Sequence, residues 1–539
     1  MPFSRSDKAY FYQRDVHQLI QHIAGQKSVV IYAGAGVSID RTGVSWGELV
    51  TRLLEEQVPD SAVRRAVMDT YTPLEAASIV CQLHTDMYAD KWMRVVVNKL
   101  RSLLYAEKSW QRGSLVATII ELAAAFVAKG VDVQIVTTNY DSFLEEEVKI
   151  LNLAREAKSI PELPFEPLLV QHGNNAGALL DPEQEKLQYI RTNTILHLHG
   201  YVPESGGETP VILSEVATIE SQVLSSAILG DLFRRNAVLI VGCSLTDPPL
   251  LSALARSIRT ETERRLHRRL RVAILPLQGI DFSRVLHGDE RADRRTVEEF
   301  ERKAKTRMRQ FDVTPTFPDF YSQVPQLLRE VQVCLDQCLA GLPYEYSAAR
   351  YGERLARWWQ TWFQGRTGSL TACQARDHEL LRDALTRIRT TLEVDPDEVL
   401  KIELWLRWEA ATARQLTLWA SSTGTWPDFD SMRRTDIRAD SHYASVRAFC
   451  LGRPEIYSTE YGSDRWRTYL CVPLRIHNGI GDLLVGVISL ASMRQLDGAE
   501  TDDQVSISEI APRNGMKVDE VIAFLREVGM KLVAPAPGA

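Results

Sequence analysis

Five short apolar runs alternate with helical segments in the first half of this chain, and this alternation is its most constraining feature. The runs are Ser28–Ala33, Val133–Thr138, Thr194–Leu198, Ala237–Val241 and Arg271–Leu275. Each run has the length and apolar character of a strand that is buried on both faces. The stretch between two of them, Ser114–Gly130, has apolar residues three or four positions apart, as a helix requires. The pattern predicts an α/β fold with a mainly parallel sheet and helices on both faces.

Glycine or polar residues follow four of the five predicted strands. These segments are Gly34–Ser38 (GAGVS), Asn139–Asp141 (NYD), His199–Gly200 (HG) and Gly242–Asp247 (GCSLTD). In open parallel sheets, ligands bind beyond the carboxyl ends of the strands. The coincidence of four such ends predicts one ligand-binding crevice at this edge of the sheet.

The first of these segments has the composition of a phosphate-binding loop. Gly34 and Gly36 allow a sharp turn and a close approach of the backbone to a ligand. Outward-facing N–H groups at such a turn bind phosphate oxygens. The alternative is that the two glycines only make a tight turn between strand and helix. A dehydrogenase of the Rossmann type fits poorly, because the acidic residues about twenty positions on, Glu55 and Glu56, lie on a helix with no strand before it.

The polar residues after the second and third strands each have two or more interpretations. Asn139 is suited to hydrogen-bond ribose hydroxyls, and Asp141 either contacts a ligand or caps the helix that follows it. His197 and His199 form a metal pair, or are core histidines with satisfied hydrogen bonds, or include a general base beside Gly200. The metal interpretation lacks a third ligand at suitable spacing.

After the fourth strand, Asp247 and Pro248 form the N-cap and first position of a helix. Ser244 and Thr246 are placed to direct hydroxyl groups toward the same crevice.

Taken in this order, the four segments resemble the motifs of the sirtuin family, in particular its divergent bacterial branch, over about residues 10–280. GAGVS resembles the first NAD-binding motif, and TTNYD resembles the T-Q-N-x-D motif. LHLHG resembles the H-G motif with the catalytic histidine, and GCSLTDP resembles the G-x-S-x-x-D-P segment. The resemblance implies that Asn139 and His199 act in catalysis. It implies that the NAD-binding residues are Gly34, Ala35, Gly36, Ser38, Asp141, Gly200, Ser244 and Asp247.

The chain departs from protein-deacylating sirtuins in two places. It lacks the two CxxC pairs of their zinc ribbon, and Arg41–Trp46 replaces their P-D-F-R segment. The resemblance therefore implies a zinc-free NAD hydrolase of bacterial antiphage defence, with NAD as its substrate and a phage-derived trigger or a partner defence protein. Two alternatives stay open, namely a module that binds a nucleotide without cleaving it and a transferase for ADP-ribosyl or acyl groups.

Beyond about residue 400, short strand-like runs separated by polar turns predict an α+β domain with an antiparallel sheet. Residues 400–495 resemble a GAF domain, a module that binds small ligands or senses signals. Five residues are candidates for a pocket or for plain core: Trp419, Trp426, Tyr457, Trp466 and Cys471. GAF-like domains dimerise through flanking helices, so the tryptophan-rich segment 346–364 predicts a homo-oligomer.

The predicted organisation is a sirtuin-like Rossmann-type domain with a helical insertion, an intervening helical connector and a GAF-like domain, followed by a tail. The boundaries are 1–285, 286–345, 346–500 and 501–539.

A net charge of −7 does not favour nucleic-acid binding. The N-terminal residues lack the apolar core of a signal peptide, and no apolar run is long enough to cross a bilayer, so we expect a cytoplasmic protein without a membrane partner. The seven scattered cysteines include no CxxC pair, which argues against a disulfide framework and a zinc site.

Overall fold

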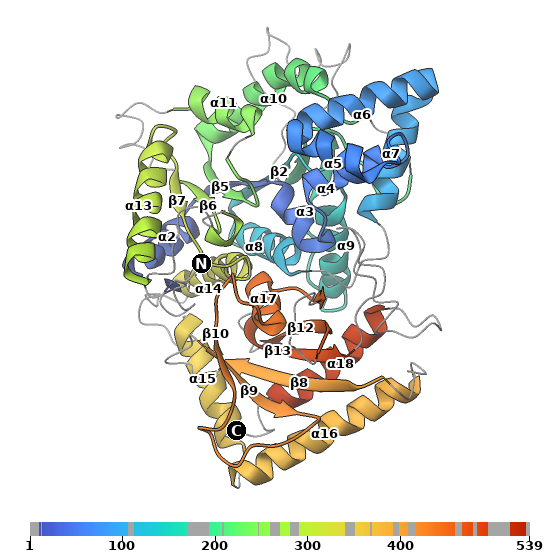
Figure 1. Ribbon diagram of the computed structural model, residues 1–539. Helices are drawn as coiled ribbons and strands as arrows, with labels where there is room; N and C mark the ends of the chain where they lie inside the picture. Colours follow the sequence, from blue (N-terminus) through green and yellow to red (C-terminus); the bar gives the residue numbers. More distant parts are fainter. Residues whose placement is uncertain are drawn as a thin grey trace.

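The fold consists of two sheets, one parallel and one antiparallel, each covered by helices (Figure 1). The computed structural model describes residues 10–11, 13–105, 113–169, 193–206, 210–245, 247–258, 270–280, 290–339, 351–366, 369–391, 398–407, 415–458, 466–477, 482–493 and 518–534.

The first sheet has seven strands in the order β3-β4-β2-β1-β5-β6-β7, and every neighbouring pair is parallel. The strands are β1 (Ser28–Ala33), β2 (Asp132–Thr137), β3 (Glu166–Leu169), β4 (Thr194–His197), β5 (Ala237–Val241), β6 (Arg271–Ile274) and β7 (Thr314–Thr316). The five apolar runs of the sequence become the five interior strands, which confirms the predicted α/β class with a parallel sheet.

The two strands that the sequence did not predict, β3 and β7, are the two edges of this sheet. Each is short and contains a proline, Pro167 or Pro315. Proline has no N–H to donate to a ladder, so strands that contain it occur at sheet edges. Neither strand has alternating polar and apolar residues or a continuous apolar run, so the sequence pattern did not predict them.

Helices cover both faces of this sheet, as predicted. One face packs against α2 (Arg14–Ala24), α8 (Leu115–Ala128), α9 (Phe143–Glu156) and α14 (Gln323–Leu339). The other packs against α10 (Glu215–Arg235), α11 (Pro248–Arg256) and Met308 of α13 (Glu290–Arg309). Successive residues of β1 point to opposite faces, so Val29 and Ile31 belong to the first core and Val30 and Tyr32 to the second.

A helical insertion follows the first strand, after α3 (Ala35–Thr42), as predicted. It comprises α4 (Trp46–Leu54), α5 (Ser61–Thr70), α6 (Pro73–Tyr88), η1 (Ala89–Lys91) and α7 (Trp92–Leu104), at the upper right of Figure 1. The apolar core of the insertion also includes Tyr140, Val202, Val211 and Leu213 from outside it. Ser45 caps α4 by accepting a 3.2 Å hydrogen bond from the Glu48 N–H.

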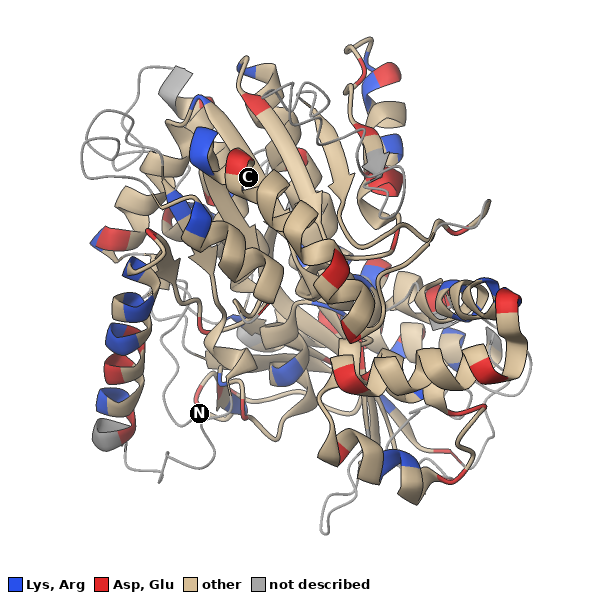
Figure 2. Ribbon diagram, turned by 90° about the horizontal axis from the view of Figure 1, so that it is seen from above, with Lys and Arg blue, Asp and Glu red and all other residues tan. Residues whose placement is uncertain are grey.

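The first sheet is completed by residues beyond the predicted boundary at 285. After η4 (Leu277–Gly279), α13 leads to β7, and α14 then packs against α8 and α2. The predicted connector, 286–345, therefore contributes a strand and a core helix to the first domain. Acidic and basic residues alternate along α13, the helix at the left edge of Figure 2.

The second sheet has six strands in the order β10-β9-β8-β13-β12-β11, and every neighbouring pair is antiparallel. The strands are β8 (Leu400–Arg407), β9 (Gln415–Ser421), β10 (Arg434–Asp436), β11 (Glu455–Ser458), β12 (Thr468–His477) and β13 (Asp482–Ser492). Helix α17 (Ala444–Leu451) covers one face over β11, β12 and β13. The other face carries α15 (Tyr351–Gln364), α16 (Leu370–Thr391) and α18 (Val518–Val533).

The predicted tail, 501–539, contains a core helix, so that assignment needs correction. Helix α18 packs on β12 and β13, and its buried residues recur three or four positions apart. The carbonyl oxygens at its end accept hydrogen bonds from the indoles of Trp358 (3.0 Å, Val533) and Trp362 (2.8 Å, Leu532). These two tryptophans of the proposed assembly helix are thus packed within their own chain.

Across the described residues, none of the helices combines the length and the apolar character that a membrane span requires.

Candidate functional site

The polar segments of the sequence meet at one edge of the parallel sheet because four neighbouring strands end at the same level. Ala33 of β1 is in register with Thr137 of β2 and with Val241 of β5, and Thr137 is in register with His197 of β4. Neighbouring strands lie about 4.8 Å apart, so the four ends span about 14 Å. The predicted convergence of these segments at the carboxyl edge is confirmed.

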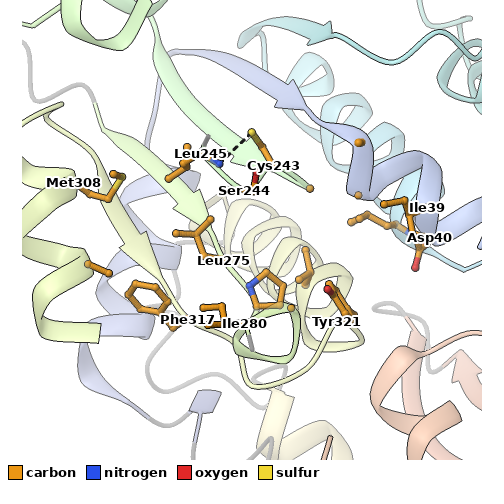
Figure 3. A pocket seen from close by; sticks show the side chains of 18 of the residues that line it. Ile39, Asp40, Cys243, Ser244, Leu245, Leu275, Ile280, Met308, Phe317 and Tyr321 are labelled. Atoms are coloured by element: carbon orange, nitrogen blue, oxygen red, sulfur yellow. Dashed lines mark hydrogen bonds between the residues drawn. The ribbon is translucent and has the colours of Figure 1, made fainter. Parts of the chain in front are cut away.

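A cavity of about 870 Å³ opens beyond the ends of β1, β5, β6 and β7 (Figure 3). Ala35 and Gly36 line it at the start of α3, and Ser244 lines it after β5. Apolar side chains from the β6 and β7 ends and from α13 form much of the wall, among them Leu275, Ile280, Phe317 and Met308. Leu451 and Arg453 of the second domain complete it.

The glycines of the GAGVS loop allow two strand-to-helix turns to touch. The Gly34 N–H donates to the Val241 carbonyl (2.9 Å) and the Gly36 N–H donates to the Gly242 carbonyl (2.8 Å). A Cβ on Gly36 would lie 2.9 Å from the Gly242 Cα, and Gly242 itself has a φ of +68°. These two N–H groups therefore join the turn after β1 to the turn after β5. Ala35, between the two glycines, is the first residue of α3 and lines the cavity.

Asn139 ties the end of β2 to the glycine loop. Its Nδ2 donates to the Gly34 carbonyl at 2.9 Å, and its own N–H donates to Thr137 Oγ1 at 3.0 Å. The side chain is buried. Since an amide has two N–H donors and an acceptor oxygen, the bond to Gly34 uses one of the donors.

Asp141 joins α3 to α9. Its carboxylate accepts from the Ser38 hydroxyl, and its Oδ1 accepts from the Phe143 N–H at 3.3 Å. Burial raises the pKa of Asp141, while the two hydrogen bonds act in the opposite direction. The N-cap residue of α9 is Ser142, so the predicted cap position was one residue early, although the Asp141 carboxylate does bind the first helical N–H.

His197 is a core histidine with hydrogen bonds on both ring nitrogens. Its Nε2 lies 2.7 Å from Glu145 Oε1, and its Nδ1 lies 3.2 Å from the Asn139 carbonyl oxygen. The second of the three predicted interpretations therefore holds for His197. Glu145 has no distinguishing signal in the sequence, because an acidic residue in the first turn of a helix is typical of a helix N-terminus.

His199 lies just beyond β4 and is half-buried. Gly200, next to it, has a φ of +100°, and a Cβ there would lie 2.3 Å from the Pro210 carbonyl oxygen. The His199 carbonyl accepts from the Ile212 N–H at 2.9 Å. Gly200 thus lets the segment 210–212 pass closely, while His199 stands at the β4 end of the row of strands, with β2 between β4 and the strands that border the cavity.

After β5, Asp247 occupies the N-cap position of α11 with Pro248 at the first helical position, as predicted. Its Oδ2 accepts a 2.9 Å hydrogen bond from the Tyr32 hydroxyl. Burial raises the pKa of Asp247, and the bond from Tyr32 lowers it. Ser244 is exposed to the cavity. Thr246 lies outside the described residues.

The second domain has a smaller pocket, of about 430 Å³, on the face of its sheet. Two of the five predicted candidates, Trp426 and Trp466, line it. The other three, Trp419, Tyr457 and Cys471, are buried in the core. A buried ion pair lies in the pocket, with Lys401 Nζ 2.6 Å from Glu403 Oε1 and 4.5 Å from the centre of a Trp466 ring.

Within the part of the chain that the structure describes, no three His, Cys, Asp or Glu side chains gather as a metal site requires.

Residues 133–299 match the sequence profile of the SIR2-like domain family. The matched segment runs from β2 into α13 and contains three of the four polar strand ends, those with Asn139, His199 and Ser244. None of the curated proteins compared with this chain matches it. Over these residues the chain is similar to SIR2-like domains, and this similarity implies the use of NAD.

Proposed function

We propose that this protein is an NAD hydrolase that converts NAD and water into nicotinamide and ADP-ribose. The observation that carries the proposal is the alignment of four adjacent strand ends, which places His199, Asn139, the glycine loop and Ser244 in one row. Three of these four groups lie in the segment that is similar to SIR2-like domains.

In this proposal NAD lies along the row of strand ends. The adenosine half occupies the cavity of about 870 Å³, whose apolar walls suit a purine ring and whose Ser244 hydroxyl suits a ribose. The pyrophosphate lies at Ala35, where the N-terminus of α3 favours negative charge. The nicotinamide ribose then lies toward Asn139 and His199.

The chemistry requires the bond between nicotinamide and ribose C1′ to break, with its electron pair leaving on the nicotinamide nitrogen. Positive charge develops on the ribose, as in glycoside hydrolysis. His199 takes a proton from the attacking water or from a ribose hydroxyl, and Asn139 orients the ribose or the water. The products are ADP-ribose, nicotinamide and one proton.

The physiological role that we propose is NAD depletion by an effector of bacterial antiphage defence, triggered by a phage-derived signal or a partner defence protein. The second domain, with its own pocket, acts as the GAF-like sensor or assembly module of a homo-oligomer. The pocket that contains Trp426, Trp466 and the Lys401–Glu403 pair supports a sensing role.

The decisive measurement is nicotinamide release from NAD by the full chain and by the variant His199→Ala. A general acid–base residue contributes about 100-fold or more to the rate, so we expect a loss of at least this size. His22→Ala, on the exposed side of α2, is the matched control and should retain the wild-type rate. Full activity of His199→Ala would contradict the assignment.

A second candidate function is nucleotide binding without cleavage. Gly34, Gly36 and Asn139 donate hydrogen bonds to other parts of the fold. These bonds favour binding without cleavage, because they give the three residues a structural role that requires no catalysis. NAD binding without any nicotinamide release, in the presence of the trigger, would support this candidate. Transfer of label from NAD to protein would instead indicate a transferase.

A further inference from the structure

Three consecutive residues of α3 make contacts in three different directions. The Ser38 hydroxyl donates to Asp141, at the strand edge. The Ile39 carbonyl accepts from the guanidinium of Arg453, in the second domain. The Asp40 carboxylate accepts from the Leu115 N–H at 2.9 Å and so holds the start of α8. This short helix, which begins with the glycine loop, therefore links the proposed NAD site to the second domain.

Arg453 lies in the turn between α17 and β11 and is itself firmly held. Its Nε lies 2.7 Å from Glu455 Oε1, and only 12% of the Arg453 side chain and 13% of the Glu455 side chain are exposed. Besides its bond to Ile39, Arg453 lines the cavity. Figure 3 shows Ile39 and Asp40 on α3, across the cavity from Met308 and Phe317.

The rest of the turn is docked on the first domain as closely. The Ser322 N–H donates to the Cys450 carbonyl at 2.9 Å. Gly452 has a φ of +74°, and a Cβ there would lie 2.8 Å from Ser322 Cβ. Arg475 donates to the Gly452 carbonyl. The position of Arg453 against α3 is thus set by the docking of the whole α17–β11 turn.

We infer that Arg453 is a positioning residue for the NAD site, supplied by the second domain, and that the site is complete only when that domain is docked. A guanidinium favours the carbonyl end of a helix, so Arg453 fixes α3 and, through Ser38 of the same helix turn, Asp141. Burial raises the pKa of Asp40, while the Leu115 N–H bond and the nearby charges of Arg453 and Arg475 oppose that rise. The identity of the ligand as NAD rests on the proposed function.

This arrangement makes the regulation of the site reciprocal. A ligand in the cavity contacts both domains, so its binding favours docking of the α17–β11 turn, and docking favours binding to the same extent. A signal that displaces the turn from α3 therefore weakens NAD binding.

The test compares the full-length wild type with Arg453→Ala, Arg453→Lys and the control Arg438→Ala. Arg438 pairs with Asp440 in the same domain and is partly exposed. Hydrogen exchange of the α3 amides and the equilibrium affinity for NAD are measured for each protein. Arg453→Ala should speed exchange in α3 and weaken NAD binding about five- to tenfold, a typical size for coupling between sites. Lysine keeps the positive charge but not the planar set of N–H donors. Arg453→Lys should therefore change α3 exchange and NAD affinity less than Arg453→Ala does.

The outcomes separate this inference from the proposed function. Faster exchange confined to the second domain, with α3 and NAD affinity unchanged, would overturn the role of Arg453. Equal effects of Arg438→Ala would overturn it as well. If α3 responds to Arg453→Ala as expected but the wild type releases no nicotinamide, the positioning role stands and the proposed hydrolysis fails.

Discussion

The two sheets of this molecule place their polar groups differently. In the parallel sheet the central strands β1 and β5 are apolar along their buried length, and the candidate site residues follow at the carboxyl edge, where neighbouring strands end in register. In the antiparallel sheet the polar groups lie within the strands. Lys401 and Glu403 of β8 are two residues apart and therefore share one face.

The difference follows from strand direction. Parallel strands all end at the same edge, so loops far apart in sequence meet there. Antiparallel strands alternate in direction, and a pocket forms instead on a face, where helix cover is incomplete. Helix α17 packs on β11, β12 and β13, whereas the smaller pocket includes residues of β8 and β9. The cavity of the first domain thus opens at an edge of its sheet, and the pocket of the second lies on a face of its sheet.

The largest expected effect comes from a substitution that blocks the close contact between the two strand-to-helix turns at the edge of the parallel sheet. Gly242→Val introduces a side chain at a φ of +68°, where a Cβ lies 2.8 Å from the Val37 nitrogen. We expect a loss of about 4 kcal/mol in the free energy of unfolding, because left-handed backbone costs about 1–2 kcal/mol and the clash adds to it. Denaturant unfolding measures this loss, and NAD binding should disappear with it.

Gly130→Ala is the control for backbone strain. Gly130 has a φ of +72°, and a Cβ there meets nothing within 4 Å. Its cost should stay at about 1–2 kcal/mol. An equal loss in both variants would show that the contact between the turns contributes nothing beyond the backbone conformation.

On the antiparallel face, the next largest effect is expected from breaking the buried ion pair. Lys401→Met leaves the Glu403 carboxylate buried without its ammonium partner, which should lower the free energy of unfolding by about 3 kcal/mol. Replacing both partners, with Lys401→Met and Glu403→Leu, should recover most of this loss. A double variant as unstable as the single one would mean that the pair itself stabilises this face.

The smallest effect is a pH dependence at the parallel edge. Burial raises the pKa of Asp247, so its protonated form is favoured in the folded state. Its contribution to stability is complete below the unfolded pKa of about 3.9 and is lost as the pH rises through the folded value. Asp247→Asn keeps an acceptor for Tyr32 and removes the charge. Relative to the wild type, its stability should therefore improve as the pH rises toward neutrality.

Thermal unfolding across this pH range provides the measurement, with Asp69→Asn on the exposed side of α5 as the baseline. A stability difference for Asp247→Asn that stays constant with pH would contradict the raised pKa.

Much of the first fold was predictable because interior parallel strands are local patterns. Each of the five apolar runs formed a strand within one residue of its predicted bounds. The edge strands were missed because their prolines and short lengths remove the pattern. Helix α18 was missed although its apolar spacing was present, since the polar residues before it suggested a tail.

The sequence predicted which polar segments meet at the edge of the sheet, but it did not predict the contacts that their residues make there. The sequence predicted that Gly36 lies in a loop whose backbone approaches a ligand. In the fold, the Gly36 N–H instead donates to the Gly242 carbonyl. Glu145 had no distinguishing signal, because acidic residues are common in the first turn of any helix. Its burial against His197 depends on how α9 lies against β4.

By itself, the sequence determined which segments become interior strands, where glycine permits a close turn and which polar residues follow each strand end. These are local properties, fixed by residues within a few positions of one another. Tertiary structure decided that β4, β2, β1 and β5 are neighbours, that Gly36 meets Gly242, and that Arg453 reaches Ile39 across 414 residues of chain. Such contacts depend on strand order and domain docking, so no local spacing encodes them.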